Sequence, residues 1–305
     1  MTIAGSTEEL LWNVSHQARW ETGLTRNYVK EMHTDFTVTA ATEHEETTTG
    51  NLLRHLAYYG QQVGVLAVQH TKRLEGGYQR KGRQVHVPSG ADLELAVEIG
   101  PGLWLNLLLQ AKALKVSKSS ATYSRWSPSQ NQKLIDWANA HGRVPGMLLY
   151  NDLFPPFVSL APPQHFPDYA CTAFGACPSV SRTQLGAWGT NSHCVGPAMT
   201  PVGISMCLDE ALMLAAKASP SLLRDFHFQI EHLLHDDEHG LAVDSTGRTL
   251  GGLATPNPPD WAARLLAARD APAPEVLDVD RPDIDDRPVE AAARVSVVMP
   301  FFDGR

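Results

Sequence analysis

The stretch GADLELAVEIGPGLWLNLLLQAKAL, residues 90–114, has the apolar composition of a buried sheet but also contains Asp92, Gln110 and Lys112. In its first part, DLELAVEI, apolar and polar residues alternate with the period of a strand that buries one face. The second part, after the GPG triplet, alternates in the same way. The pattern predicts two neighbouring strands, and the positions of the three polar side chains depend on how these strands pair.

The GPG triplet predicts that pairing, because it fits a three-residue hairpin loop. If Ile99 pairs with Leu103, then Asp92 lies opposite Gln110. Lys112 follows two residues later, and the pleat returns it to the face of Gln110, next to Asp92. One carboxylate, one amide and one amine are therefore expected to converge on one patch.

Two interpretations of this patch are open at this point. In the first, the hairpin lies at a sheet edge and its polar residues face water. In the second, the strand is covered on both sides, as the three consecutive leucines of residues 107–109 indicate. An unpaired Asp or Lys would then be costly, and a metal ion or a phosphate would compensate its charge.

The flanking sequence predicts the elements around the hairpin. EETTTGNLLRHLAYYG (45–60) has helical spacing and ends in glycine, and VGVLAVQH (63–70) is typical of a strand. WSPSQNQKLIDWANAHG (126–142) predicts a helix with Ser127 as N-cap, and VPGMLLYN (144–151) predicts a further strand. The expected order over this region is α-β-β-β-α-β.

GAD and QAK, in this order of elements and preceded by a helix with a glutamate at its start, resemble the motifs of the PD-(D/E)XK nuclease superfamily. They most resemble the variant of Mrr-like restriction endonucleases, in which the third motif reads Q-x-K. More narrowly, the motifs are similar to those of an uncharacterised bacterial family built on that core. The resemblance covers about residues 42–151 and implies an α/β restriction-endonuclease-like fold, a mixed sheet flanked by helices.

The resemblance also implies roles for individual residues. Asp92 matches the metal-binding acid of the second motif, Gln110 takes the place of the third-motif acid, and Lys112 matches the motif lysine. The main-chain carbonyl of Ala111 and the carboxylate of Glu46 are implied as further ligands of Mg²⁺ or Mn²⁺. The implied activity is that of a metal-dependent nuclease, in particular a DNA endonuclease with a role in defence against foreign DNA.

The charge distribution favours a nucleic acid as partner. The net charge is −8, but residues 51–150 carry twelve Lys and Arg against five Asp and Glu. The loop KRLEGGYQRKGR (72–83) contains Arg80, Lys81 and Arg83, which we expect to contact phosphates, although a solvated charged loop is the alternative. Gln130, on the helix after the lysine strand, is a further candidate contact.

The second half of the chain carries weaker signals. Cys171, Cys177, His193 and Cys194 form a loose zinc-ligand pattern, for which buried thiols are the favoured interpretation. A helical segment is expected from about Met206 to His235, with the histidines 232, 235 and 239 on a hydrated face. Residues 251–305, with ten acids and six arginines, are expected to form a linker or disordered tail.

We thus expect four segments: an N-terminal helical segment (1–41), the nuclease-like core (42–155), a helical or loop-rich extension packed on it (156–250) and an acidic, Pro-rich, partly disordered tail (251–305). No apolar run approaches the ~20 residues of a membrane helix, and no leader pattern begins the chain, so we expect a cytoplasmic protein without a membrane partner. A homodimer remains open.

Two rival functions also remain open. Because Gln110 replaces an acid, the chain fits a binding module for nucleic acid or protein that keeps the fold without hydrolysis. Alternatively, it is an effector that a protein partner activates through the acidic tail.

Overall fold

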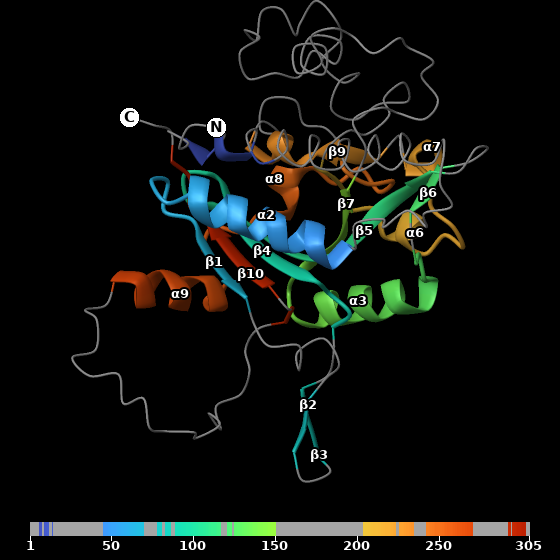
Figure 1. Ribbon diagram of the computed structural model, residues 1–305, viewed down its shortest axis with the longest axis horizontal. Helices are drawn as coiled ribbons and strands as arrows, with labels where there is room; N and C mark the ends of the chain where they lie inside the picture. The colour runs from blue at the N-terminus through green and yellow to red at the C-terminus, as the bar shows by residue number, and fades with distance from the viewer. Residues whose placement is uncertain are drawn as a thin grey trace, which may run out of the picture.

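The computed structural model describes residues 6–7, 9–11, 14, 45–69, 78–80, 83–86, 89–116, 121–123, 125–150, 204–223, 226–234, 242–270, 292–293 and 295–302. Within these residues eight strands form one mixed sheet in the order β1-β10-β4-β5-β7-β8-β9, with β6 paired to β5 (Figure 1). Helices lie on both faces of this sheet, so the chain has the expected α/β class with a mixed sheet flanked by helices.

The strands of the sheet are β1 (Leu66–Gln69), β4 (Leu93–Gly100), β5 (Leu103–Val116), β6 (Ala121–Tyr123), β7 (Val144–Tyr150), β8 (Ile204–Cys207), β9 (His227–Gln229) and β10 (Val295–Met299). A separate hairpin consists of β2 (Tyr78–Arg80) and β3 (Arg83–His86). The helical segments are α2 (Glu45–Tyr59), α3 (Pro128–Ala140), α6 (Glu210–Met213), α7 (Pro220–Leu223), η3 (Ile230–Leu234), α8 (Leu250–Leu253) and α9 (Asp260–Asp270).

The hairpin predicted from the quoted stretch consists of β4 and β5. The two strands are antiparallel, and Leu93 pairs with Leu109 in the predicted register. The register shifts only near the turn, where Gly100 instead of Ile99 pairs with Leu103. The odd-numbered apolar residues of both strands therefore lie on one face of the sheet, as expected.

Both faces of β5 are covered, which decides between the two interpretations of the hairpin. Leu107 and Leu109 are fully buried in the cluster beneath α2, and Leu108 is fully buried in the cluster beneath α3. An edge hairpin with one wet face is thus excluded for this part of β5. Its polar side chains must be accommodated inside the protein.

Helix α3 begins and ends where the sequence predicts. Its N-cap is Ser127, whose Oγ accepts a hydrogen bond from the Gln130 backbone N–H at 3.4 Å, and Pro128 is the first helical residue. The helix carries the chain from β5 back to the start of β7, which pairs with β5 in parallel. Its first turn consequently lies towards the end of the sheet at which β5 and β7 terminate.

Helix α2 covers the opposite face of the sheet, on which Leu52 and Leu56 pack with the buried leucines of β4 and β5. It is followed by Gly60, where a Cβ atom would lie 2.4 Å from the Leu56 carbonyl oxygen and 2.7 Å from Val65 Cβ. Only glycine permits this tight turn into β1. Leu10, Leu11 and Val14 near the N-terminus are buried in the same cluster.

The expectation of a helix from Met206 to His235 is wrong. This part of the chain forms β8 and β9, which extend the sheet beyond β7, and the helices between and after these strands are short. Of the three histidines expected on one helix face, His232 lies in the five-residue 3-10 helix η3. His235 and His239 lie outside the described residues, as do Cys171, Cys177, His193 and Cys194.

The C-terminal segment also differs from the linker or tail expected there. Helix α9 packs on the sheet, and β10 lies between β1 and β4, antiparallel to the first and parallel to the second. All five residues of β10 are buried. The acidic, Pro-rich composition of the surrounding sequence concealed this short apolar strand.

Candidate active site

The side chain of Asp92 lies where β4 begins. Its Oδ2 accepts a hydrogen bond from the backbone N–H of Ala111 at 2.9 Å, and its own N–H donates to the Leu109 carbonyl at 2.9 Å. Since β4 begins only at Leu93, the Asp92 carboxylate accepts the Ala111 N–H that would otherwise bond to the main chain of a neighbouring strand. It reaches the main chain between Gln110 and Lys112, as the predicted register requires.

The carbonyl of Ala111 faces the same side of β5 as its N–H group, because a strand residue directs both groups to one neighbour. Beyond the start of β4 that neighbour is the Asp92 side chain. A carboxylate and a main-chain carbonyl are therefore directed to one place in the structure, and oxygen donors of these two kinds are the ligands that Mg²⁺ and Mn²⁺ favour.

Gln110 is buried, with 1% of its surface exposed. Its Nε2 donates to the Gly90 carbonyl at 3.1 Å, whereas its Oε1 has no hydrogen-bond partner among the described residues. A buried acceptor without a donor costs about 1–3 kcal/mol. Such an atom indicates a water molecule or a ligand.

Lys112 is also buried, with 3% of its surface exposed. It pairs with Leu149 of β7 and lies two residues after Gln110, so the two side chains share the face of the sheet that α3 covers. Asp92, just before β4, thus contacts the main chain of β5 between Gln110 and Lys112, while the side chains of these two residues share one face of the sheet.

The loop before Asp92 holds this group together. Gly90 has φ +79°, a backbone conformation that glycine adopts without strain. Ser89 Oγ donates to the Ala292 carbonyl and accepts from the Ala91 N–H at 3.1 Å, which fixes the loop against the chain preceding β10. Sequence reasoning missed Ser89 and Gly90, although the dipeptide SG before a strand is itself a turn signal.

Glu46 lies in the first turn of α2, as expected, but its side chain is outside the described part of the structure. Thr49 Oγ1 lies 2.9 Å from Tyr150 Oη, which places the start of α2 over the end of β7. Tyr150 pairs with Ala113, next to Lys112. The helix start therefore lies towards the same end of the sheet, on the face opposite to Lys112.

The predicted nucleic-acid contacts lie on two elements. Arg80 and Arg83 pair with each other at the end of the β2–β3 hairpin, and Lys81 lies outside the described residues. Gln130 is exposed in the first turn of α3, and a methyl group on Gly90 would lie 3.7 Å from its Cγ. Gln130 is thus adjacent to the loop that precedes Asp92.

Glu94 shares the strand face of Asp92 but has a different environment. It is fully buried and forms an ion pair with Arg143 at 3.0 Å, while Ser296 Oγ donates to its other oxygen. Burial raises the pKa of Glu94, and the charge of Arg143 and the hydrogen bond from Ser296 oppose this shift. The guanidinium of Arg143 also lies over the rings of Trp137 and Trp261, at 4.9 and 6.0 Å from their centroids. This buried pair joins β4, β10 and the start of β7.

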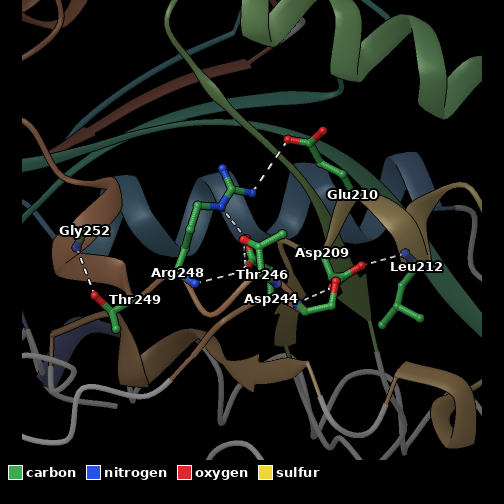
Figure 2. A network of polar contacts seen from close by, with 9 residues as sticks. Asp209, Glu210, Leu212, Asp244, Thr246, Arg248, Thr249 and Gly252 are labelled. Atoms are coloured by element: carbon green, nitrogen blue, oxygen red, sulfur yellow. Dashed lines mark hydrogen bonds and ion pairs between the residues drawn. The ribbon is translucent and has the colours of Figure 1, made fainter.

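A second acidic group contains Asp209, Glu210 and Asp244 (Figure 2). Asp209 Oδ1 caps α6 through the Leu212 N–H at 2.7 Å, and its Oδ2 accepts from the Ser245 N–H at 2.6 Å. Asp244 accepts from Thr246 and from Arg248. Burial pushes the pKa of Asp244 up, but these hydrogen bonds and the Arg248 charge outweigh it and hold the pKa below its usual value. Each carboxylate serves to hold a turn in place.

Two further properties of the described residues bear on function. No group of three or more His, Cys, Asp and Glu side chains converges in this part of the chain. No helix among these residues is long and apolar enough to cross a membrane.

Fold and site define an α/β protein whose mixed sheet carries a carboxylate at the start of β4, beside a buried amide and a buried amine of β5. Residues 14–195 match the model of the family described as "Family of unknown function (DUF6615)", and the chain belongs to that family. Neither a curated protein nor a solved structure matches the chain.

Proposed function

We propose that this protein is a metal-dependent nuclease of the PD-(D/E)XK kind with a restriction-endonuclease-like core. The observation that carries the proposal is the hydrogen bond between Asp92 Oδ2 and the Ala111 N–H, which sets the carboxylate between Gln110 and Lys112. The order α-β-β-β-α-β of α2, β1, β4, β5, α3 and β7 supports it. The insertion of β10 between β1 and β4 is a feature that the sequence resemblance did not imply.

The residues at the patch fit a hard divalent cation. Asp92, the Ala111 carbonyl and Glu46 would hold Mg²⁺ or Mn²⁺, and the buried Oε1 of Gln110, which has no partner among the described residues, fits a donor such as metal-bound water. When bound, the cation supplies charge neutralisation at the phosphate and lowers the pKa of a coordinated water molecule.

Lys112 and Gln110 have distinct tasks in this proposal. The ammonium group of Lys112 orients the attacking water or stabilises the negative charge that develops on the phosphate. Its burial excludes bulk water and strengthens that interaction. Gln110 accepts a hydrogen bond and orients its donor, but an amide cannot act as a general base.

DNA is the substrate that we propose. The β2–β3 hairpin projects from the body of the molecule, and its second strand leads into the loop before Asp92 (Figure 1). Arg80, Lys81 and Arg83 on this hairpin would follow a phosphate backbone that runs into the site. Gln130 would contact the substrate from the first turn of α3. The role in defence against foreign DNA rests on the sequence resemblance alone.

A binding module without hydrolysis is the second candidate, and one observation favours it. The hydrogen bond from Ala111 gives the Asp92 carboxylate a structural task, the capping of β5, that requires no metal ion. In that case Gln110 and Lys112 would contact phosphates without chemistry.

Incubation of supercoiled plasmid with the pure protein, with and without Mg²⁺ or Mn²⁺, distinguishes the two candidates. We expect metal-dependent nicking that Asp92→Asn abolishes and Lys112→Met slows about 10²- to 10³-fold. Asp136→Asn, on the exposed side of α3, should cut like the parent protein. Plasmid binding without cleavage in either metal would favour the binding module. Cleavage by Asp92→Asn at the rate of the parent protein would refute the proposed site.

A further inference from the structure

Asn131 is a buried polar residue in the first turn of α3 that sequence reasoning did not single out. None of its surface is exposed, and its Nδ2 donates to the Met213 carbonyl at 2.6 Å. This bond fixes the orientation of the amide, since a flipped side chain would set two oxygens against each other. Its Oδ1 has no hydrogen-bond partner among the residues described.

Gln110, on β5, likewise has an amide nitrogen with a hydrogen-bond partner and a buried amide oxygen without one among the described residues. Its Nε2 is bonded to the Gly90 carbonyl and its buried Oε1 has no partner within the described part of the chain. The first turn of α3 adjoins this loop, because a Cβ on Gly90 would lie 3.7 Å from both Cγ and the main-chain oxygen of Gln130, the residue before Asn131. Asn131 belongs to the buried side of α3, which packs on the face of the sheet that carries Gln110. Two such amide oxygens therefore lie on the side of β5 that α3 covers.

Buried acceptors of this kind require a donor, and the donor must be small enough for a packed layer. Both oxygens are neutral, so they suit the O–H groups of water better than a bare cation, for which carboxylates are the stronger ligands. Mg²⁺ dehydrates reluctantly and usually keeps several waters beside one or two carboxylates. Asp92 is the carboxylate that this layer adjoins.

We infer that Asn131 is a positioning residue of the metal site, and that it and Gln110 accept hydrogen bonds from the water shell of a hydrated divalent cation held at Asp92. This inference rests on the proposed function. It assigns the amides to the outer shell of the ion, and it explains why a glutamine serves in place of an acid at position 110.

Cobalt(III) hexammine tests the outer-shell role directly. This complex does not exchange its ligands, and its N–H groups stand in for the hydration water of Mg²⁺. Binding of the complex and of Mg²⁺ is measured by isothermal titration calorimetry on the full chain. We expect the parent protein to bind both.

The variants separate the acceptor role of Asn131 from its bond to Met213. Asn131→Ala and Asn131→Asp both lose the Nδ2 donor, but only Asn131→Asp keeps an acceptor oxygen. We expect Asn131→Ala to weaken both affinities about 10- to 100-fold, the effect typical of losing a residue that hydrogen-bonds to a metal ligand. We expect Asn131→Asp to bind at least as tightly as the parent protein, although its second oxygen faces the Met213 carbonyl and lowers the free energy of unfolding. Gln132→Ala is the matched control, because Gln132 is exposed on the same helix and its side chain donates to Asp136, away from Met213.

The outcomes distinguish this inference from the proposed function. If Asp92→Asn loses Mg²⁺ binding but Asn131→Ala binds both ligands like the parent protein, the metal site stands and the role of Asn131 is refuted. If the parent protein binds neither ligand, the proposed metal site itself fails. Should Asn131→Ala not fold, Gln110→Ala tests the other amide of the same water shell, and a folded Gln110→Ala that binds both ligands like the parent protein refutes the inference.

Discussion

At the scale of single residues, the site combines groups that ordinarily avoid a protein interior. Gln110 and Lys112 are buried in the middle of the sheet, and Asp92 turns into the plane of the sheet to cap the main chain at Ala111. Burial of such groups costs free energy unless each has a hydrogen-bond or ionic partner. A buried amide oxygen that has no partner among the described residues therefore points to a ligand.

Replacement of Lys112 by methionine tests its role with little change in packing, because the apolar stem of the side chain is retained. We expect the cleavage rate at saturating DNA to fall about 10²- to 10³-fold, the effect typical of removing one transition-state donor, with DNA affinity nearly unchanged. Single-turnover cleavage and fluorescence anisotropy measure the two quantities. Lys133→Met, at an exposed position, is the control. Cleavage by Lys112→Met at the rate of the parent protein would disprove the role assigned to Lys112.

Cys207 gives a second test at this scale. Burial raises the pKa of its thiol to about 12, so almost no thiolate exists near neutral pH. We expect no modification of Cys207 by iodoacetamide in the native protein and rapid modification in urea, as followed by mass spectrometry of the peptide that contains it. Native-state labelling at the rate found in urea would show that β8 is not packed in the core.

At the scale of elements, the Glu94–Arg143 pair joins strands that are far apart in sequence. Both side chains are buried, so removal of one partner leaves an uncompensated charge. Burial already raises the pKa of Glu94 above its ordinary value of 4.5. A group with a raised pKa in the folded state stabilises most below its unfolded pKa, and that contribution is lost as the pH rises through the folded pKa.

Arg143→Met should therefore destabilise the protein in a pH-dependent manner. We expect a decrease of about 3–5 kcal/mol in the free energy of unfolding at about pH 8, where Glu94 must stay charged without a partner or take up a proton. The decrease should be smaller at about pH 5, because Glu94 then binds a proton at little cost. Urea unfolding at both pH values measures this. The Glu94→Gln, Arg143→Met double variant should lack the dependence, and an equal decrease at both pH values in the single variant would contradict the explanation.

The β2–β3 hairpin is the element to which we assign phosphate binding. Charge reversal at Arg80, Lys81 and Arg83 should raise the DNA concentration needed for cleavage and leave the rate at saturation largely intact. The slope of log affinity against log salt should become shallower by about 0.9 for each phosphate that the hairpin no longer neutralises. Anisotropy titrations over a salt series measure this slope, with Lys217→Glu as the control on an exposed residue outside the hairpin. An unchanged slope would show that the hairpin does not contact DNA phosphates.

At the scale of the whole molecule, the sheet is completed by three strands that lie outside the residues matched by the family model. β8 and β9 extend it beyond β7, and β10 returns from the C-terminus to its middle. Thr7 Oγ1 donates to the Pro300 carbonyl at 2.8 Å, so a residue near the N-terminus is tied to the end of β10. Both ends of the chain thus contribute to one core.

Removal of residues 292–305 should consequently prevent stable folding. It would delete β10, leave β1 and β4 with unpaired edges and expose apolar residues of both strands. We expect aggregation and loss of the cooperative urea transition, measured by size-exclusion chromatography and circular dichroism. Removal of residues 303–305 alone is the control. A monomeric, cooperatively folding product of the longer deletion would show that β10 is dispensable.

The sequence by itself determined the hairpin of β4 and β5, its register and both boundaries of α3, because these depend on pleat, turn and cap residues that are neighbours in the chain. The prediction that Asp92, Gln110 and Lys112 lie together follows from that register alone. By contrast, β8, β9 and β10 are short, and such runs carry no periodicity that distinguishes strand from helix or linker.

Only the tertiary structure decided which polar groups are satisfied. Glu94 meets Ser296 across 202 residues of sequence, and Asn131 meets Met213 across 82, so no local pattern reveals these contacts. The same long-range packing buries Gln110 Oε1 and Asn131 Oδ1 without a donor among the described residues. Burial is a property of the assembled layers, and for that reason Asn131 became a candidate only in the folded chain.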